Sequence, residues 1–231
     1  MSVVSDGTPS ALVARRSIRR YLEKPVSDEV VQSLLLEARW APSASNTQST
    51  DIYVLSGEPF KKFKAELRKR SEDDVAPVSD LDMKPQWPPR HEARMKELME
   101  IRSSWIAAQE KKAGIEPPAV PVNPMVAGAA IFGAPLMLVL AFDKTIPVYT
   151  GCFDAGLFAM AITLAAHARG LGTCIFAAPL RYSDLVREAI PGLEDKIVVV
   201  GIALGYPDRD AFINRFPRTR VLLKEYVTFV R

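Results

Sequence analysis

Apolar side chains recur at the spacing of helices in two stretches of the first third of the chain. Between residues 30 and 38 they return every three or four positions, behind Ser27, a residue type that favours the N-cap of a helix. In the basic stretch "PFKKFKAELRKR", Phe60, Phe63 and Leu67 share one side of a helix. Both patterns predict helices that pack one face against a core.

A second set of apolar runs predicts the centre of the protein. The stretch "FDAGLFAMAITLAAHARG", residues 153–170, is apolar around most of a helical circumference, which is typical of a central helix or a subunit interface. Shorter apolar runs predict strands at residues 51–57, at 136–142, near Thr173 and at 196–205. Because helices and a long excursion separate these strands without strict alternation, we predict an α+β fold rather than a doubly wound sheet.

One uncharged stretch approaches the length of a membrane span. It is "MVAGAAIFGAPLMLVLAF", residues 125–142, and the sequence Gly133-Ala134-Pro135 interrupts it. Since proline and glycine break a continuous helix, we expect a short buried helix followed by a buried strand, and no membrane partner.

The stretch from about residue 58 to 124 differs from the rest of the predicted single domain, residues 1–231. It is rich in proline from Ser71 onward and contains a long charged helix. An excursion of this kind is usually functional or disordered, and we expect this one to cover the active site. The tail from Val221 has the composition of a strand, and we expect it to reach a partner subunit.

Composition and motifs exclude several classes of function. The formal net charge is +3 and 48% of residues are apolar, which is ordinary for a globular protein. With two cysteines and two histidines, neither a disulfide framework nor a metal site is expected. Nucleotide-binding motifs fail, because Ala134 replaces the P-loop lysine and Ile175 replaces the third glycine of a dinucleotide fingerprint. The N-terminus lacks the pattern of a secretory signal, which predicts a cytoplasmic protein.

Two polar clusters remain as candidate chemistry. The first is "RRSIRR", residues 15–20, and the second is "APSASNTQ", residues 41–48. Taken alone they are typical of a solvated charged face and of a turn. Together they suggest that arginines and a hydroxyl bind a phosphate, with amide side chains that read the edge of a heterocycle. Nucleic-acid binding by the arginines is the alternative, although the aromatic residues expected between basic ones are missing.

The order of "RRSIRRY", "APSASNTQ", "LAAHARGLGT", "GIALGYP" and "R-T-R" along the chain resembles the FMN-dependent nitroreductase family. The resemblance implies a central, mainly antiparallel sheet flanked by helices, in an intertwined homodimer with FMN at the subunit interface. It also implies an oxidoreductase that passes electrons from NADH or NADPH to a small aromatic acceptor, nitroaromatic or quinone-like, by a ping-pong mechanism. A reductive dehalogenase or another flavin-using relative of the same fold is the alternative within this resemblance.

The resemblance also implies roles for individual residues. Arg15 would hold the phosphate, and Arg19 would lie near the pyrimidine end of the flavin. A second subunit would supply the segment from Pro42, and the backbone after the strand near Thr173 would face flavin N5. The cofactor-binding candidates are Arg15, Arg16, Ser17, Arg19, Pro42, Ser43, Ala44, Asn46, Gln48, Ala177, Ala178, Arg218 and Arg220. The candidates for contact with the acceptor are Ser45, Trp87 and Trp105. No side chain stands out as a catalytic acid or base.

Overall fold

A four-stranded sheet forms the centre of the protein. The computed structural model describes residues 10–81, 86–116 and 128–231. The strands are β1 (Thr50–Ser56), β2 (Leu136–Asp143), β3 (Gly172–Phe176) and β4 (Lys196–Gly205). Their order is β1-β2-β4-β3, and every neighbouring pair is antiparallel. The predicted α+β fold with a mainly antiparallel sheet is therefore confirmed.

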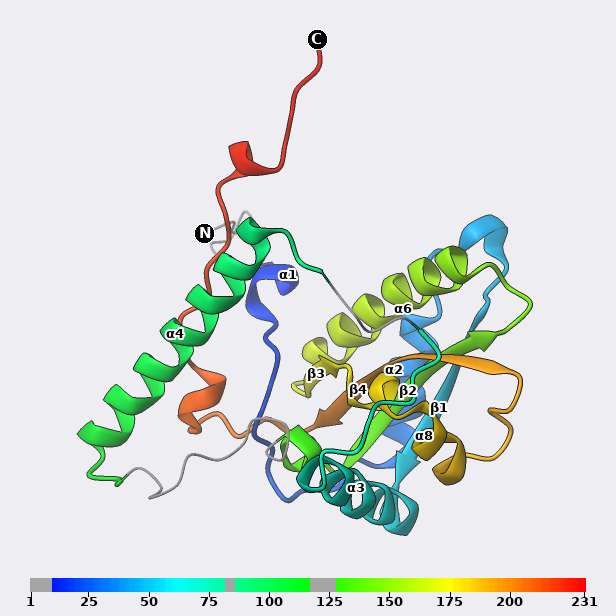
Figure 1. Ribbon diagram of the computed structural model, residues 1–231, viewed down its shortest axis with the longest axis horizontal. Coiled ribbons are helices and arrows are strands. Elements are labelled where there is room, and N and C mark those ends of the chain that lie inside the picture. The colour runs from blue at the N-terminus through cyan, green and yellow to red at the C-terminus, as the bar shows by residue number, and fades with distance from the viewer. Residues whose placement is uncertain (1–9, 82–85, 117–127) are drawn as a thin grey trace.

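Helices cover both faces of this sheet, as Figure 1 shows. Side chains of β2 point alternately to the two faces, because successive residues of a strand face opposite ways. Met137 and Val139 pack in a cluster with α3 (Gly57–Glu72) and α8 (Ser183–Ala189), whereas Leu138 and Leu140 pack with α2 (Asp28–Ala38) and α6 (Val148–Ala168). The remaining short elements are α1 (Ala11–Ala14), η1 (Ala44–Asn46), η2 (Ile131–Gly133), α7 (Ala178–Arg181), η3 (Phe212–Asn214) and η4 (Leu223–Glu225).

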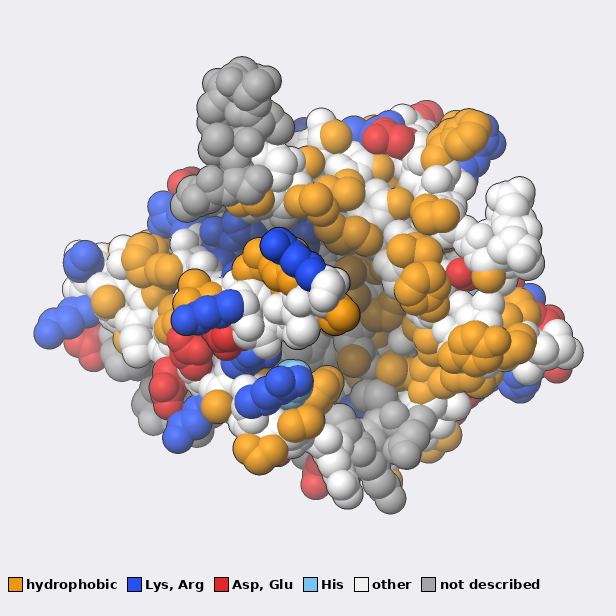
Figure 2. Space-filling model, turned by 90° about the horizontal axis from the view of Figure 1, so that it is seen from above, with side chains coloured by type: hydrophobic (Ala, Val, Ile, Leu, Met, Phe, Trp, Pro, Cys, Tyr) orange, Lys and Arg blue, Asp and Glu red, His pale blue; other side chains and the backbone are white. Residues whose placement is uncertain are grey.

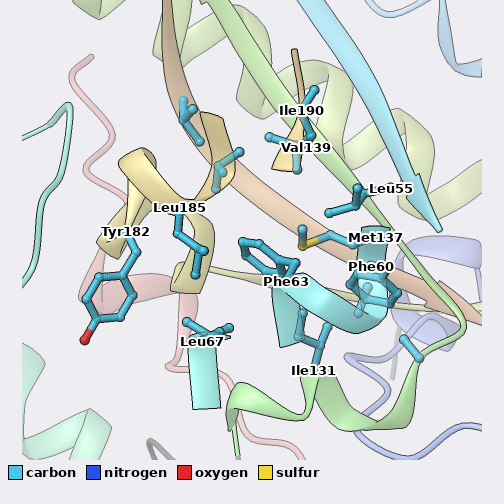
Figure 3. Close-up of a cluster of buried hydrophobic side chains, with 14 of the residues drawn as sticks. Leu55, Phe60, Phe63, Leu67, Ile131, Met137, Val139, Tyr182, Leu185 and Ile190 are labelled. Atoms are coloured by element: carbon cyan, nitrogen blue, oxygen red, sulfur yellow. The ribbon is translucent and has the colours of Figure 1, made fainter. Parts of the chain in front are cut away.

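The two sequence-predicted amphipathic helices form as expected. Ser27 is the extended N-cap residue of α2, which ends at Ala38. Figure 3 shows Phe60, Phe63 and Leu67 of α3 pointing into the cluster beneath the sheet, and all three are buried. Residues 57–72 therefore belong to the core, so the part of the predicted excursion that leaves the core begins after α3.

The long charged helix α4 (Pro89–Lys112) stands apart from the sheet, beside the C-terminal tail (Figure 1). Arg94 of this helix forms an ion pair with Glu225 of the tail at 3.2 Å. The tail forms the single turn η4 and no strand, so its strand-like composition is misleading. An extended segment needs a neighbouring strand to satisfy its backbone, and none lies beside the tail in the described part of the chain.

The helix α6 is long and apolar enough to cross a membrane by length and composition alone. The core helix of a globular protein meets the same test, and α6 packs against α2 and the sheet. It is only partly covered, since Tyr149 and Phe153 near its start are 80% and 68% exposed. When the molecule is viewed from above, apolar side chains surround a hollow in the surface (Figure 2).

The contact between Gly172 of β3 and Ile18 allows a test of how the N-terminal arginine segment is attached. A Cβ atom on Gly172 would lie 2.7 Å from Ile18 Cγ1. Gly172→Ala should therefore push the segment away from β3 and lower the free energy of unfolding by about 1–3 kcal/mol. Gly128→Ala is the matched control, because no atom lies within 4 Å of its added Cβ. Urea unfolding of both variants measures the difference, and equal stabilities would contradict the close packing.

Candidate active site

The segment that carries the first arginine cluster is tied to the edge of the sheet by backbone hydrogen bonds. Ser17 pairs with Thr173 of β3, and the Ile18 N–H donates to the Thr173 carbonyl at 2.8 Å. Further along, the Leu22 N–H donates to the Tyr206 carbonyl at 2.9 Å. Ile18 is buried between these attachments, so the arginines on either side of it have fixed positions on the sheet.

A buried asparagine attaches this segment at a further point. Asn214 is 5% exposed, and its Oδ1 accepts the Arg19 N–H at 2.7 Å. Its Nδ2 donates to the carbonyls of Arg20 and Asp208, each at 2.8 Å. All three of these hydrogen bonds join the Asn214 side chain to backbone groups, so Asn214 acts as a structural clamp. Sequence reasoning missed it, because a lone asparagine in a loop has no distinguishing pattern.

Arginines from the two ends of the chain meet beside this clamp. Arg218 donates through Nη2 to the Val13 carbonyl at 2.7 Å and through Nη1 to the Arg15 carbonyl. Arg16 donates to the Phe216 carbonyl, and its guanidinium lies 5.7 Å from the centre of the Phe216 ring. Arg218 of the R-T-R sequence therefore lies beside the first arginine cluster. Arg220 is exposed and donates to its neighbour, the Thr219 carbonyl.

The charges in this cluster raise one another's free energy. The pKa of Arg16 is lowered by burial and by the nearby Arg218 and Arg19. The pKa of Arg218 is lowered by burial and by the nearby Arg220 and Arg15. Cations held together in this way are stabilised by an anion that binds between them, particularly one able to accept several hydrogen bonds.

A cavity of about 390 Å³ opens next to these arginines. Arg15 and Arg16 line it, and so do Arg209 and Arg215, which sequence reasoning did not select. The Nε of Arg15 is buried and meets no hydrogen-bond partner within the described residues. The one acidic side chain in the lining, Asp208, accepts the N–H groups of Asp210 and Ala211. The cavity therefore carries an excess of positive charge that suits a phosphate.

His167 of α6 also lines this cavity. It was not among the candidate site residues selected from the sequence. Its pKa is lowered by burial first and then by the nearby Arg209 and Arg15. Both effects disfavour the imidazolium, since burial removes water and the arginines repel a further cation.

The second polar cluster forms a separate site in the same chain. Around η1, Ser45, Asn46 and Gln48 adopt positive φ angles of 49°, 58° and 50°. The backbone N–H of Gln48 donates to Ser43 Oγ at 2.9 Å. A smaller cavity of about 180 Å³ is lined here by Pro42, Ser43 and Gln48, together with Arg39, Ala41, Ser49, Thr50, Asp154 and Phe158. It shares no lining residue with the arginine cavity, so a single chain does not bring the two clusters together.

The remaining candidates lie away from both cavities. Ala177 is exposed directly after β3, and Ala178 begins α7. Trp87 is 48% exposed and lies beside the His91 ring, while Trp105 lies in α4. Arg102 of α4 is half-buried, and its pKa is lowered by burial and by the nearby Arg19. Helix α4 therefore adds Arg102 as one more cation near the arginine segment. The sequence did not single out Arg102, because charged residues are spread over the whole helix.

Comparison with known proteins decides the family. A sequence model of the nitroreductase family matches residues 12–206. The chain belongs to the nitroreductase family. This confirms the family that the motifs predicted, and with it the prediction of an enzyme.

Relatives of this nitroreductase match along nearly their whole length. The 4-nitrobenzoate reductase of Pseudomonas putida is 28% identical over 237 residues, which cover 100% of this chain and 98% of that protein. The nitrobenzene nitroreductase of Ectopseudomonas oleovorans is 28% identical and covers 94% of this chain, with 93% of its own length matched. The structure of the FMN-dependent nitroreductase NfnB from Mycobacterium smegmatis in complex with NADPH has a TM-score of 0.80. It is 23% identical over 96% of each chain, so it shows a shared fold.

The lowered pKa of His167 makes the stability of the FMN-free nitroreductase depend on pH. In the unfolded chain this histidine takes up a proton as the pH falls through its ordinary value of about 6.5. In the folded chain it resists protonation, so the unfolded state binds more protons and stability falls as the pH decreases through that range. Denaturant unfolding should show that the free energy of unfolding falls less between pH 7.5 and pH 5.5 for His167→Gln than for the wild type. Equal losses would show that His167 titrates normally.

Proposed function

We propose that this protein is an FMN-dependent nitroreductase that transfers two electrons at a time from NADH or NADPH to a small aromatic acceptor. For a nitro group the balanced reaction is Ar–NO₂ + NAD(P)H + H⁺ → Ar–NO + NAD(P)⁺ + H₂O. Family membership supports the class, and nitroaromatic reductases among the relatives support the acceptor. The observation that carries the proposal is that Arg15 and Arg16 from the first part of the chain line one cavity together with Arg209 and Arg215 from the last part.

The residues of this cavity fit the phosphate of FMN. A phosphate carries charge opposite to the arginine cluster, and it could accept a hydrogen bond from the buried, unpaired Arg15 Nε. Arg15, Arg16, Ser17, Arg218 and Arg220 are the proposed phosphate and ribityl contacts, with Arg19 near the pyrimidine end of the flavin and the Ala177-Ala178 backbone facing N5. When bound, FMN supplies the redox chemistry, taking hydride from the nicotinamide and returning electrons to the acceptor.

The protein's own contribution is charge stabilisation and shielding from water. Arg19 would stabilise the negative charge that two-electron reduction places at the pyrimidine end of the flavin. No side chain is assigned as an obligate acid or base, because solvent can supply the proton that the product needs. Donor and acceptor would use the same site in turn, which predicts a ping-pong mechanism. Quinone-like acceptors suit the same site, since they also accept two electrons.

A second copy of the chain would complete each site. Pro42, Ser43 and Gln48 line a separate cavity of the same chain. We propose that this segment, including Ala44 and Asn46, contacts the flavin of the partner subunit and that Ser45 contacts the acceptor. Several large apolar side chains that a subunit interface would cover are exposed: Trp40 is 81% exposed, Tyr149 80% and Phe229 71%. A homodimer explains both observations. Contact of the acceptor with Trp87 or Trp105 and a cytoplasmic location stay predictions.

The proposal is tested on the purified protein. We expect a yellow dimer by light scattering, with one FMN per chain that bleaches when NADH or NADPH is added without oxygen. Steady-state rates with 4-nitrobenzoate or a quinone should give parallel double-reciprocal lines, and intersecting lines would contradict ping-pong kinetics. A colourless protein that takes up no added FMN would overturn the proposed function and favour nucleic-acid binding. Halide release from a haloaromatic in the same assay would instead favour the dehalogenase alternative.

Replacement of single arginines separates phosphate binding from control of the redox potential. Arg15→Met should loosen FMN with little change in its potential, because the phosphate has the same charge in both redox states. Arg19→Met should retain FMN but lower its two-electron potential by about 30–60 mV, since a charge-assisted contact contributes roughly 1.5–3 kcal/mol. Spectroelectrochemical titration measures both variants. Arg20→Met is the matched control because Arg20 is exposed, and its midpoint should stay at the wild-type value.

A further inference from the structure

Asp154 is a buried carboxylate in the otherwise apolar first half of α6. It is 2% exposed, although its neighbour Phe153 is 68% exposed. Its Oδ1 accepts the Ala44 N–H at 3.1 Å, and its Oδ2 accepts the Ser49 hydroxyl at 2.9 Å. Burial of a carboxylate is unfavourable unless its oxygens are hydrogen-bonded. Both of these donors come from one loop, residues 43–49, so the carboxylate and the loop hold each other in place.

Burial of side chains does not stabilise the backbone conformation of the 43–49 loop. Ser45, Asn46 and Gln48 are exposed, and each has a positive φ angle, which residues other than glycine seldom adopt. A conformation of this kind persists only where the surroundings enforce it. The side-chain hydrogen bonds of this loop include those from the Ala44 N–H and the Ser49 hydroxyl to Asp154, the bond from the Gln48 N–H to Ser43 Oγ, and a longer one from Gln48 Nε2 to the Asn46 carbonyl at 3.4 Å.

We propose that Asp154 is the positioning residue that sets the shape of the 43–49 loop for binding of FMN in the site of the partner subunit. The inference rests on the proposed function, and Asp154 would act through its bonds to the loop residues Ala44 and Ser49. A loop already held in its binding conformation loses little conformational freedom when the ligand binds, and this strengthens binding. Without the carboxylate, the loop would have to be ordered by FMN itself.

The experiment measures the dissociation constant of FMN by fluorescence titration of FMN-free protein. Asp154→Ala should raise this constant about 10- to 100-fold, because two hydrogen bonds to a charged group are lost. Asp154→Asn should stay within about threefold of the wild type, since an amide can still accept the Ala44 N–H and donate to Ser49 Oγ. Ile162→Val, a buried change in the same helix that is remote from the loop, should leave FMN affinity unchanged while lowering stability slightly.

A double-mutant cycle distinguishes positioning from general damage. If Asp154 acts through the loop, its replacement should lose most of its effect once Asn46, one of the proposed flavin contacts in this loop, has been changed to alanine. We expect Asp154→Ala to change FMN affinity less than threefold in the Asn46→Ala background. Ser49→Ala removes one loop donor and leaves α6 intact, so it carries the test if Asp154→Ala does not fold, and it should raise the dissociation constant several-fold.

Three results would overturn the inference. The first is wild-type FMN affinity in Asp154→Ala or, if that variant does not fold, in Ser49→Ala. The second is that Asp154→Ala lowers FMN affinity equally in the wild-type and Asn46→Ala backgrounds. The third is that Asp154→Asn binds FMN as weakly as Asp154→Ala. Failure of the proposed function looks different, because the wild-type protein would then take up no FMN at all.

Discussion

Mutual repulsion among arginines is the constraint on which the arrangement of this site depends. The pKa values of Arg16 and Arg218 are lowered by burial first and then by the positive charges of neighbouring arginines. Backbone bonds hold them there, from Ile18 to Thr173 and from Arg19 to Asn214. The folding of the sheet therefore stabilises a positive cavity before any ligand arrives. A preorganised charge of this kind binds an anion without further rearrangement.

The central helix α6 connects the two halves of the proposed flavin site. Near its start Asp154 supports the 43–49 loop, and near its end His167 lines the arginine cavity. Thirteen residues separate these positions, which corresponds to about 20 Å along a helix. One rigid element thus keeps the two halves apart within a chain, and it exposes Phe153 directly beside Asp154. This geometry is the physical reason that the proposed site needs a second copy.

Much of this fold could be predicted because it rests on local patterns. Phe60, Phe63 and Leu67 lie at helical spacing and are buried together, and the continuous apolar run of β2 is the buried strand of the sheet. The tail was different, because a strand requires a partner that composition does not reveal. The arginine clusters were visible as charge runs. Asn214, Asp154 and His167 were not, since each acquires its role from residues more than 100 positions away or from a cavity that only the fold creates.

The bond between Arg218 and Val13 joins positions 205 residues apart in the sequence. During synthesis the first arginine cluster leaves the ribosome long before Asn214 and Arg218 are made. The anion cavity consequently does not exist on the growing chain, and contacts this distant in sequence also form late in folding because the intervening loop must close first. Binding of a phosphate at this cavity is therefore confined to a chain that already carries Arg209, Asn214 and Arg215, and a chain cut directly after Tyr206 would keep all four strands of the sheet but lack one side of the cavity.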